Sequence, residues 1–314
     1  MRGKNSMPLA PEYQAMFEQV AAAGPTPKLS ELPLAIAREG YRMSRPVNSE
    51  LAVHAIEDIS IDGPLGDIPL RIYRPTGAGP FGTLVYFHGG GWVIGDVDTC
   101  DSVCRQIATL ANVVVVSVDY RLSPEHVFPA AVDDCYAAVQ WAAEHGAELA
   151  SNGKIGVAGE SAGGTLATVM THMARDQDGP ALAFQGLFYP VIEAAMERES
   201  WHRNGTGYLL EREIMTWFWE TYCPNPSDRQ DPRTAPIEAA SLANLPPALV
   251  VTAEFDPLQD EGKAYAEALT AAGSSAVLLP CDGVVHDFFA TAALFECSRQ
   301  PFLTTVEHIK SHLN

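Results

Sequence analysis

The chain has 314 residues, of which 47% are apolar and 19% charged, a composition typical of a folded globular protein and not of a disordered one. Its 20 basic and 39 acidic residues give a formal charge of −19, which argues against nucleic acid and anionic membranes as partners. No stretch approaches the roughly 18 apolar residues of a membrane helix, and the first residues lack the apolar core of a signal peptide. The six cysteines form no CxxC pair, so we interpret them as free thiols and expect a cytoplasmic protein.

The spacing of apolar residues predicts strands that alternate with helices over most of the chain. In chain order we predict helices at 12–23 and 29–43, a hairpin of strands at 54–61 and 68–73, a strand at 83–87, a helix at 103–110, a strand at 113–118 and a helix at 130–145. The second half contains strands at 155–158, 186–192, 248–253 and 276–279, and helices at 165–175, 211–222, 261–272 and 301–313. This alternation predicts an α/β fold with a mainly parallel central sheet flanked by helices.

One segment, between the predicted strands 186–192 and 248–253, breaks this alternation. It is rich in aromatic residues, among them Trp201, Trp217 and Phe218. These rings could line an apolar pocket under a lid, or could simply attach the lid to the core. We therefore expect four parts in the chain: N-terminal helices that belong to a cap (1–53), the first part of the core (54–192), a cap insertion (193–240) and the second part of the core (241–314).

The sequence Gly-Glu-Ser-Ala-Gly-Gly at residues 159–164 carries the strongest functional signal. It has the form GxSxG and stands between a predicted strand and a predicted helix, which is the context of a nucleophile elbow. Its small residues let the backbone turn sharply and hold the hydroxyl of Ser161 clear of the sheet. The N–H of Ala162 would then lie at a helix N-terminus, where it can bind a developing oxyanion. A glycine-rich helix start with a capping serine is the structural alternative.

A second signal is His-Gly-Gly-Gly-Trp at residues 88–92, directly after the predicted strand 83–87. Three successive glycines leave backbone N–H groups uncovered by side chains and free to converge on a negative oxygen, as acyl transfer requires. A phosphate-binding loop is the competing interpretation. No Walker-type lysine and serine or threonine follow the glycines, so the oxyanion hole is favoured.

These two motifs, together with Asp-Tyr-Arg-Leu-Ser-Pro-Glu-His at 119–126, Asp-Pro-Leu-Gln-Asp-Glu at 256–261 and a histidine at 286, resemble the hormone-sensitive-lipase-like carboxylesterases (bacterial family IV) of the α/β-hydrolase superfamily. The similarity runs from about residue 70 to the C-terminus, and the N-terminal helices and the insertion resemble the cap of that family. The resemblance implies an α/β-hydrolase fold with a helical cap. It also implies hydrolysis of small apolar esters with short to medium acyl chains, without a cofactor or metal.

The resemblance also implies a role for individual residues. Ser161 is expected to be the nucleophile, Asp256 the acid and His286 the base of a catalytic triad. The N–H groups of the oxyanion hole are expected from three positions, namely Gly90, Gly91 and Ala162.

The residues alone support the same triad, because a serine nucleophile needs a base and a carboxylate that orients it, and in this fold they follow in the order Ser, Asp, His. Asp256 follows the predicted strand 248–253, and His286 follows the strand 276–279, so both are expected at the sheet edge that carries Ser161. Two rival acids are close in sequence. Glu254 lies nearer to the end of the strand, and Asp260 is expected to cap the helix that follows.

Other charged side chains receive lesser roles. His88 is expected to brace the glycine loop through hydrogen bonds, whereas His308 and His312 are interpreted as a solvated helix face and not as metal ligands. Asp287 follows His286, where the family commonly has glycine. We expect its carboxylate to favour the imidazolium form of His286 and to move the acid limb of kcat/KM to higher pH.

The predicted function is therefore that of a serine carboxylesterase. A non-catalytic ligand-binding protein on the same scaffold is the alternative from another class, and an amidase or lactonase would use the same triad. The sequence leaves open the acyl chain, the alcohol group and the oligomeric state, with a homodimer as one option.

Overall fold

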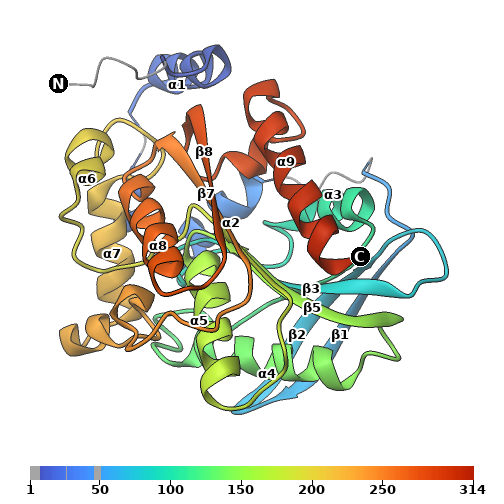
Figure 1. Cartoon of the computed structure of the whole chain (residues 1–314). Helices are drawn as coiled ribbons and strands as arrows, with labels where there is room; N and C mark the ends of the chain where they lie inside the picture. Colours follow the sequence, from blue (N-terminus) through green and yellow to red (C-terminus); the bar gives the residue numbers. More distant parts are fainter. Residues whose placement is uncertain (1–7, 26, 46–50) are drawn as a thin grey trace.

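The computed structural model describes residues 8–25, 27–45 and 51–314, and an eight-stranded sheet forms the centre of this part of the chain (Figure 1). The strand order is β1-β2-β4-β3-β5-β6-β7-β8. β1 pairs antiparallel with β2 and β2 antiparallel with β4, whereas the pairs from β4 to β8 are parallel. The strands are β1 (Ala55–Gly63), β2 (Gly66–Arg74), β3 (Phe81–Phe87), β4 (Val114–Val118), β5 (Ser151–Glu160), β6 (Phe184–Phe188), β7 (Ala248–Phe255) and β8 (Ala276–Val285). The predicted α/β class with a mainly parallel sheet is confirmed.

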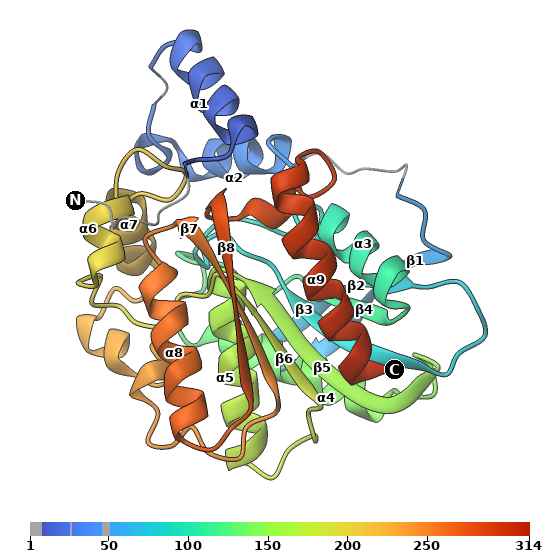
Figure 2. The ribbon, with the colours of Figure 1, turned by 45° about the horizontal axis from the view of Figure 1, so that its top comes forward.

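Helices cover both faces of this sheet, so successive side chains of a central strand are buried in two different apolar clusters. In β3, Val85 and Phe87 belong to the apolar cluster beneath α4, α5 and α8, whereas Leu84 and Tyr86 belong to the cluster beneath α3 and α9. A strand that is buried on both faces has no polar side, which explains its unbroken apolar run. Figure 2 shows α9 crossing one face of the sheet while α5 and α8 lie on the other. The α-helices are α1 (Pro11–Ala23), α2 (Leu34–Met43), α3 (Asp101–Ala111), α4 (Ala130–Glu144), α5 (Ala162–Asp176), α6 (Glu199–Asn204), α7 (Arg212–Tyr222), α8 (Gln259–Ala271) and α9 (Glu296–Leu313).

Two predicted elements are shorter than expected because proline interrupts them. The helix predicted over 29–43 is split by Pro33 into a short 3₁₀ turn (Leu29–Glu31) and α2. The strand predicted over 186–192 ends at Phe188, where Tyr189 takes a positive φ of 38° and Pro190 has no N–H to give to a neighbouring strand.

Two other elements extend beyond their predicted limits. β8 continues from the predicted end at residue 279 to Val285, through Pro280, which is tolerated because β8 pairs on one side only, with β7. This extension delivers the chain directly to His286. The last helix begins at Glu296, five residues before Pro301, and runs through that proline to Leu313.

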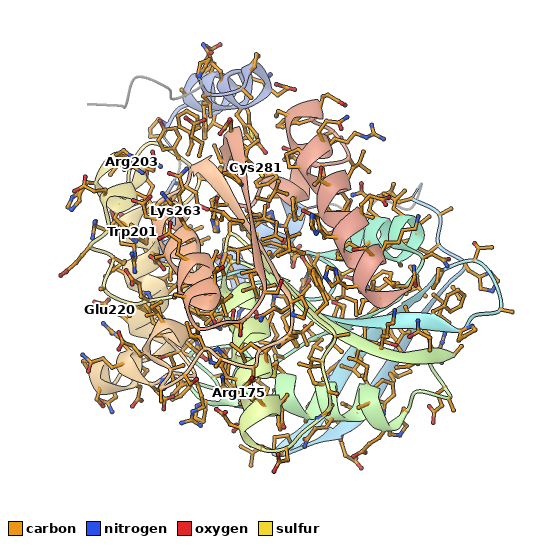
Figure 3. All side chains as sticks on the ribbon, viewed as in Figure 1. Arg175, Trp201, Arg203, Glu220, Lys263 and Cys281 are labelled. Carbon is orange, nitrogen blue, oxygen red and sulfur yellow. The ribbon has the colours of Figure 1, made fainter. Side chains whose placement is uncertain are left out.

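The N-terminal helices and the segment after β6 lie at the end of the sheet where β7 and β8 finish (Figures 1 and 2). α1 is held there by Tyr13, whose buried hydroxyl lies 2.8 Å from Ser298 Oγ and 2.7 Å from Thr291 Oγ1. α6 packs against α8, where the indole N–H of Trp201 donates to Glu261 Oε1 at 2.7 Å (Figure 3). Within the described residues, no helix is long and apolar enough to cross a membrane.

Candidate active site

Ser161 stands at a sharp turn between β5 and α5. Its φ of 55° and ψ of −119° lie outside the allowed regions for ordinary residues, and such a conformation persists only where the surroundings enforce it. Here the Ser161 N–H donates to the carbonyl of Phe188 at 2.9 Å. The flanking glycines are sterically required, because a Cβ on Gly159 would lie 2.2 Å from the carbonyl oxygen of Gly163, and one on Gly163 would lie 2.0 Å from that of Phe87.

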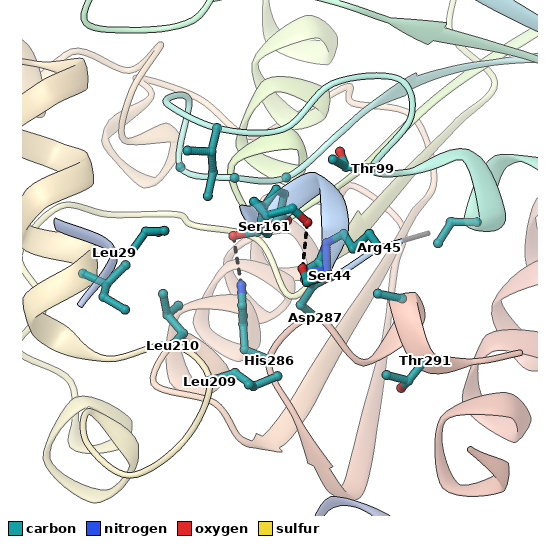
Figure 4. A pocket seen from close by; sticks show the side chains of 18 of the residues that line it. Leu29, Ser44, Arg45, Thr99, Ser161, Leu209, Leu210, His286, Asp287 and Thr291 are labelled. Carbon is teal, nitrogen blue, oxygen red and sulfur yellow. Dashed lines mark hydrogen bonds and ion pairs between the residues drawn. The ribbon is translucent and has the colours of Figure 1, made fainter. Parts of the chain in front are cut away.

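Three side chains from three strand ends meet at this turn. His286 Nε2 lies 3.0 Å from Ser161 Oγ, and His286 Nδ1 lies 2.7 Å from Asp256 Oδ2 (Figure 4). Asp256 is fully buried, and its second oxygen accepts the backbone N–H of Leu258 at 2.8 Å. The carboxylate is therefore fixed on both oxygens. A buried carboxylate at Nδ1 holds the imidazole with Nε2 free to accept a proton.

The two rival acids face other partners. Glu254 accepts the backbone N–H of Gly283 at 2.8 Å, and so connects β7 to β8. Asp260 accepts the N–H of Ser200 at 2.8 Å and forms an ion pair with Arg203 at 3.4 Å. Of the three acids considered from the sequence, only Asp256 contacts His286 in the structure.

The glycine loop after β3 brings its backbone to Ser161. Gly90 and Gly91 both have positive φ, 111° and 58°, and both line the cavity that contains Ser161. The N–H of Gly89 is directed to Glu160 Oε1 at 3.4 Å, whereas no hydrogen bond from the N–H groups of Gly90 and Gly91 is present within the described part of the chain. These two donors remain free for a ligand.

The third candidate donor, Ala162, is the first residue of α5. Its N–H is among the groups at a helix N-terminus that have no partner inside the helix, and the helix dipole favours negative charge there. The glycine loop and the start of α5 thus bring backbone N–H groups close to Ser161.

His88 braces the glycine loop, as predicted. Its Nδ1–H donates to the carbonyl of Gly89 at 2.7 Å, and its ring stacks on Tyr120 with centroids 4.2 Å apart. The Tyr120 hydroxyl in turn donates to the carbonyl of His88 at 2.7 Å. Burial lowers the pKa of His88 to about 4, so this ring is neutral at physiological pH and acts as a structural link.

Asp287 has a partner that the sequence analysis did not identify. It forms an ion pair with Arg45, which follows α2 and is distant in sequence. Asp287 also takes a left-handed conformation (φ 63°, ψ 28°), which glycine adopts without strain and which aspartate tolerates better than most other residues. Arg45 could not be identified as the partner from the sequence, because only the fold brings Arg45 and Asp287 together.

A cavity of about 570 Å³ surrounds Ser161 and His286, within the usual range for small-molecule sites. In Figure 4 the labelled leucines lie on one side of Ser161, and polar side chains lie on the other. The apolar lining residues include Met16, Leu29, Leu209, Leu210, Ile214 and Phe218. The polar lining residues include Tyr41, Ser44, Arg45, Thr99, Ser102, Asp287 and Thr291. Both the N-terminal helices and the segment after β6 therefore contribute to the cavity wall. Phe218 lines the cavity and also packs within the core.

His308 and His312 lie one turn apart on α9 and contact each other through the backbone. Nδ1 of His312 lies 2.8 Å from the carbonyl of His308 on the same helix. Among the described residues, no cluster of three or more histidine, cysteine, aspartate or glutamate side chains is arranged to hold a metal ion.

Comparison with known proteins places this geometry in a family. Residues 84–290 match the family model described as the alpha/beta hydrolase fold. The carboxylesterase NlhH of Mycobacterium tuberculosis is 44% identical over 261 residues, which are 81% of each chain. The ethyl acetate hydrolase of Pseudomonas putida is 36% identical over 98% of this chain and 100% of its own.

A solved structure extends the similarity to three dimensions. The hyperthermophilic esterase from Pyrobaculum calidifontis superposes with a TM-score of 0.91 at 41% identity, over 97% of this chain and 99% of that one. These matches in sequence and fold agree with the resemblance that the motifs carry. The chain belongs to the α/β-hydrolase fold family and, within it, to the hormone-sensitive-lipase-like carboxylic ester hydrolases.

Proposed function

We propose that this carboxylic ester hydrolase is a serine esterase in which Ser161, His286 and Asp256 form the catalytic triad. The observation that carries the proposal is the continuous hydrogen-bonded chain from Ser161 Oγ through the His286 ring to the buried Asp256, at the wall of a cavity. A serine hydroxyl is a weak nucleophile until a positioned base removes its proton, and this chain supplies that base.

In the proposed first step, Ser161 Oγ attacks the ester carbonyl carbon while its proton moves to His286 Nε2. Asp256 accepts the Nδ1–H and stabilises the imidazolium that forms. The negative charge that develops on the carbonyl oxygen is stabilised by the N–H groups of Gly90, Gly91 and Ala162.

In the second half of the reaction, the tetrahedral intermediate collapses to an acyl-enzyme, and His286 Nε2–H protonates the departing alcohol. Water then attacks the acyl-enzyme carbonyl, again with His286 as base, and the carboxylic acid leaves Ser161 free. We infer that the donors of the oxyanion hole are aligned before the reaction, because hydrogen bonds fix the glycine loop: the Gly90 carbonyl accepts the N–H groups of Val93 and Ile94 at 3.1 and 3.0 Å.

We propose that the substrates are small esters with an apolar acyl chain of about two to eight carbons, because the cavity is of limited size. Each methylene that becomes buried contributes about 0.8 kcal/mol, or about a fourfold increase in kcat/KM, until the apolar side is filled. Two lining residues, Leu209 and Leu294, are also exposed to solvent, which supports an opening of the cavity to the surface. We assign the cap to residues 1–53 and 193–240, and the core to 54–192 and 241–314.

The test is a panel of p-nitrophenyl esters from acetate to laurate, with an amide and a lactone of similar size beside them. Activity should peak within the short and medium esters, and Ser161→Ala should lose at least three powers of ten in kcat/KM while it keeps the circular dichroism of the parent. An organophosphonate should label Ser161 in the parent enzyme. Strong hydrolysis of long-chain triglyceride emulsions would contradict the proposed substrate size, and retention of activity in Ser161→Ala would contradict the triad.

We further propose a cytoplasmic location, supported by six cysteines that are all free thiols. A homodimer stays a prediction, which sedimentation of the purified protein would test.

A further inference from the structure

The active site is strongly acidic apart from one arginine. Three carboxyl groups surround the base: Asp256 at its Nδ1, Asp287 next to it in the chain, and Glu160, the buried residue before Ser161. Among the described residues that line the cavity, Arg45 is the only lysine or arginine. This cation comes from the N-terminal segment, directly after α2, and not from the strands that carry the triad.

Arg45 is held in place by two contacts. It pairs with the Asp287 carboxylate, and its guanidinium lies over the ring of Tyr41, 4.2 Å from the centroid. The side chains of Arg45 and Asp287 are only 16% and 11% exposed, so solvent screens the pair weakly. The pair therefore attaches the end of α2 to the residue that follows His286.

The charge of Arg45 reaches other groups around the base. Burial raises the pKa of the Glu160 carboxyl, and the Arg45 charge and the His286 ring oppose that rise. Burial likewise raises the pKa of Tyr189, whose ring centroid lies 5.1 Å from that of His286, and Arg45 again acts in the opposite direction. Among the described residues, the titratable or charged groups around His286 include Asp256 at its Nδ1, Tyr189 against its ring, Glu160, Asp287, and Tyr41 and Arg45, which line the same cavity. Glu254 lies near the end of β7 and is bonded to Gly283 of β8.

We propose that Arg45 is a positioning residue of this active site. By pairing with Asp287, it compensates the negative charge beside the base and fixes the turn that carries His286. The proposal rests on the proposed function, because it assigns His286 the role of base. The N-terminal segment would then act on the charge around the base, in addition to lining the cavity. The imidazole must be neutral to accept the Ser161 proton, and an unpaired Asp287 would favour the imidazolium.

The sign of the effect distinguishes the two partners. Without Arg45, the negative charge of Asp287 is uncompensated, so the acid limb of kcat/KM moves to higher pH. Without the carboxylate of Asp287, the positive charge of Arg45 is uncompensated, so the limb moves to lower pH. We expect each shift to be about 0.5 to 1 in pH, below the 1 to 3 of a direct ion contact, because Arg45 binds Asp287 and not the imidazole itself.

The experiment compares pH profiles of kcat/KM on p-nitrophenyl butyrate at low ionic strength for five proteins. They are the parent, Arg45→Gln, Arg45→Lys, Asp287→Asn and the double variant Arg45→Gln/Asp287→Asn. Asparagine is chosen at 287 because it tolerates the left-handed conformation. The two single neutral variants should shift the limb in opposite directions, Arg45→Lys should stay near the parent, and the double variant should return close to it.

Arg42→Gln is the matched control. Arg42 lies one turn earlier on α2, and its Nε bonds Asp96 at 2.8 Å outside the cavity lining, so the variant loosens the same helix without changing charge beside His286. Its acid limb should superpose on that of the parent. The proposal is overturned if Arg45→Gln, folded by circular dichroism, keeps the parental limb, or if Arg42→Gln moves it equally. An inactive parent or an active Ser161→Ala would instead contradict the proposed function, so the two failures are distinguishable.

Discussion

Substitution of Gly91 by alanine tests the proposed oxyanion hole and its contact with the proposed cap at one position. A Cβ on Gly91 would lie 2.2 Å from Cγ of Phe218, whose ring comes from α7. The ring or the loop must therefore move by about 1.2 Å, the difference between 2.2 Å and the 3.4 Å at which ordinary contact begins. The positive φ of 58° adds roughly 1–2 kcal/mol of backbone strain for any residue with a Cβ.

A loop displaced by about 1 Å no longer presents its N–H to the oxyanion. Loss of one such donor costs about 2.7–4 kcal/mol of transition-state stabilisation, which is 10²–10³ in kcat. We therefore expect Gly91→Ala to lower kcat on p-nitrophenyl butyrate by that factor, with a smaller change in KM. Stopped-time assays of the purified, folded variant measure both constants.

The control for backbone strain is Gly273→Ala. Gly273 also has a positive φ, 84°, but a Cβ there meets nothing within 4 Å, so it should lose stability and keep parental kcat. Phe218→Ala in the Gly91→Ala background should restore part of kcat, because it removes the clashing ring. Parental kcat in Gly91→Ala, or an equal loss in Gly273→Ala, would refute the assignment of the loop to the oxyanion hole.

The other predictions concern the choice of acid and the stability at low pH. Asp256→Asn should lower kcat by about 10³–10⁴ because His286 then loses its orienting carboxylate, while Asp260→Asn should change it less than tenfold; a larger effect of Asp260→Asn would reverse the assignment. Burial lowers the pKa of His172 to about 4, whereas its value in the unfolded chain is near 6.5. Between these two pH values the unfolded state binds more protons than the folded state. The free energy of unfolding should therefore fall by up to about 3 kcal/mol as the pH falls from 6.5 to 4. His172→Gln should therefore lose less stability than the parent between pH 7 and pH 4.5 in urea unfolding, and an equal loss in both proteins would contradict this cause.

The meeting of Ser161, His286 and Asp256 at one sheet edge could be predicted, because each of them follows a strand or lies in a motif that is recognisable in the sequence. Ser161 lies in a glycine-rich turn that needs no tertiary information to be recognised, and parallel strands bring their carboxyl ends to one edge. Asp256 was favoured over Glu254 and Asp260 by the resemblance, and the structure gives the physical difference, which is that the other two carboxylates bond elsewhere.

The features that escaped prediction depend on pairing across the fold. The extension of β8 through Pro280 is stable only because β7 supplies the other half of the ladder. For Phe218 the sequence left open whether the ring lines a pocket or only packs the lid, and the close approach of α7 to Gly91 places it in the cavity wall. The pairing of Arg45 with Asp287 joins two segments that are distant in the sequence. The effect of the Asp287 charge on His286 could therefore be expected from the sequence, but the partner of Asp287 could not.

The attachment of α1 has a consequence for the order in which the protein is assembled on the ribosome. The hydroxyl of Tyr13 bonds Thr291 and Ser298, which are 278 and 285 residues away, and the N–H of Ala10 donates to Gly283 at 2.9 Å. These partners do not exist until residues 283–298 have been synthesised, so α1 cannot make these contacts before then. A nascent chain stopped before residue 283 lacks both the anchors of its own N-terminus and His286. The contacts that attach α1 and the histidine that bonds Ser161 therefore become available together, when residues 283–298 are made.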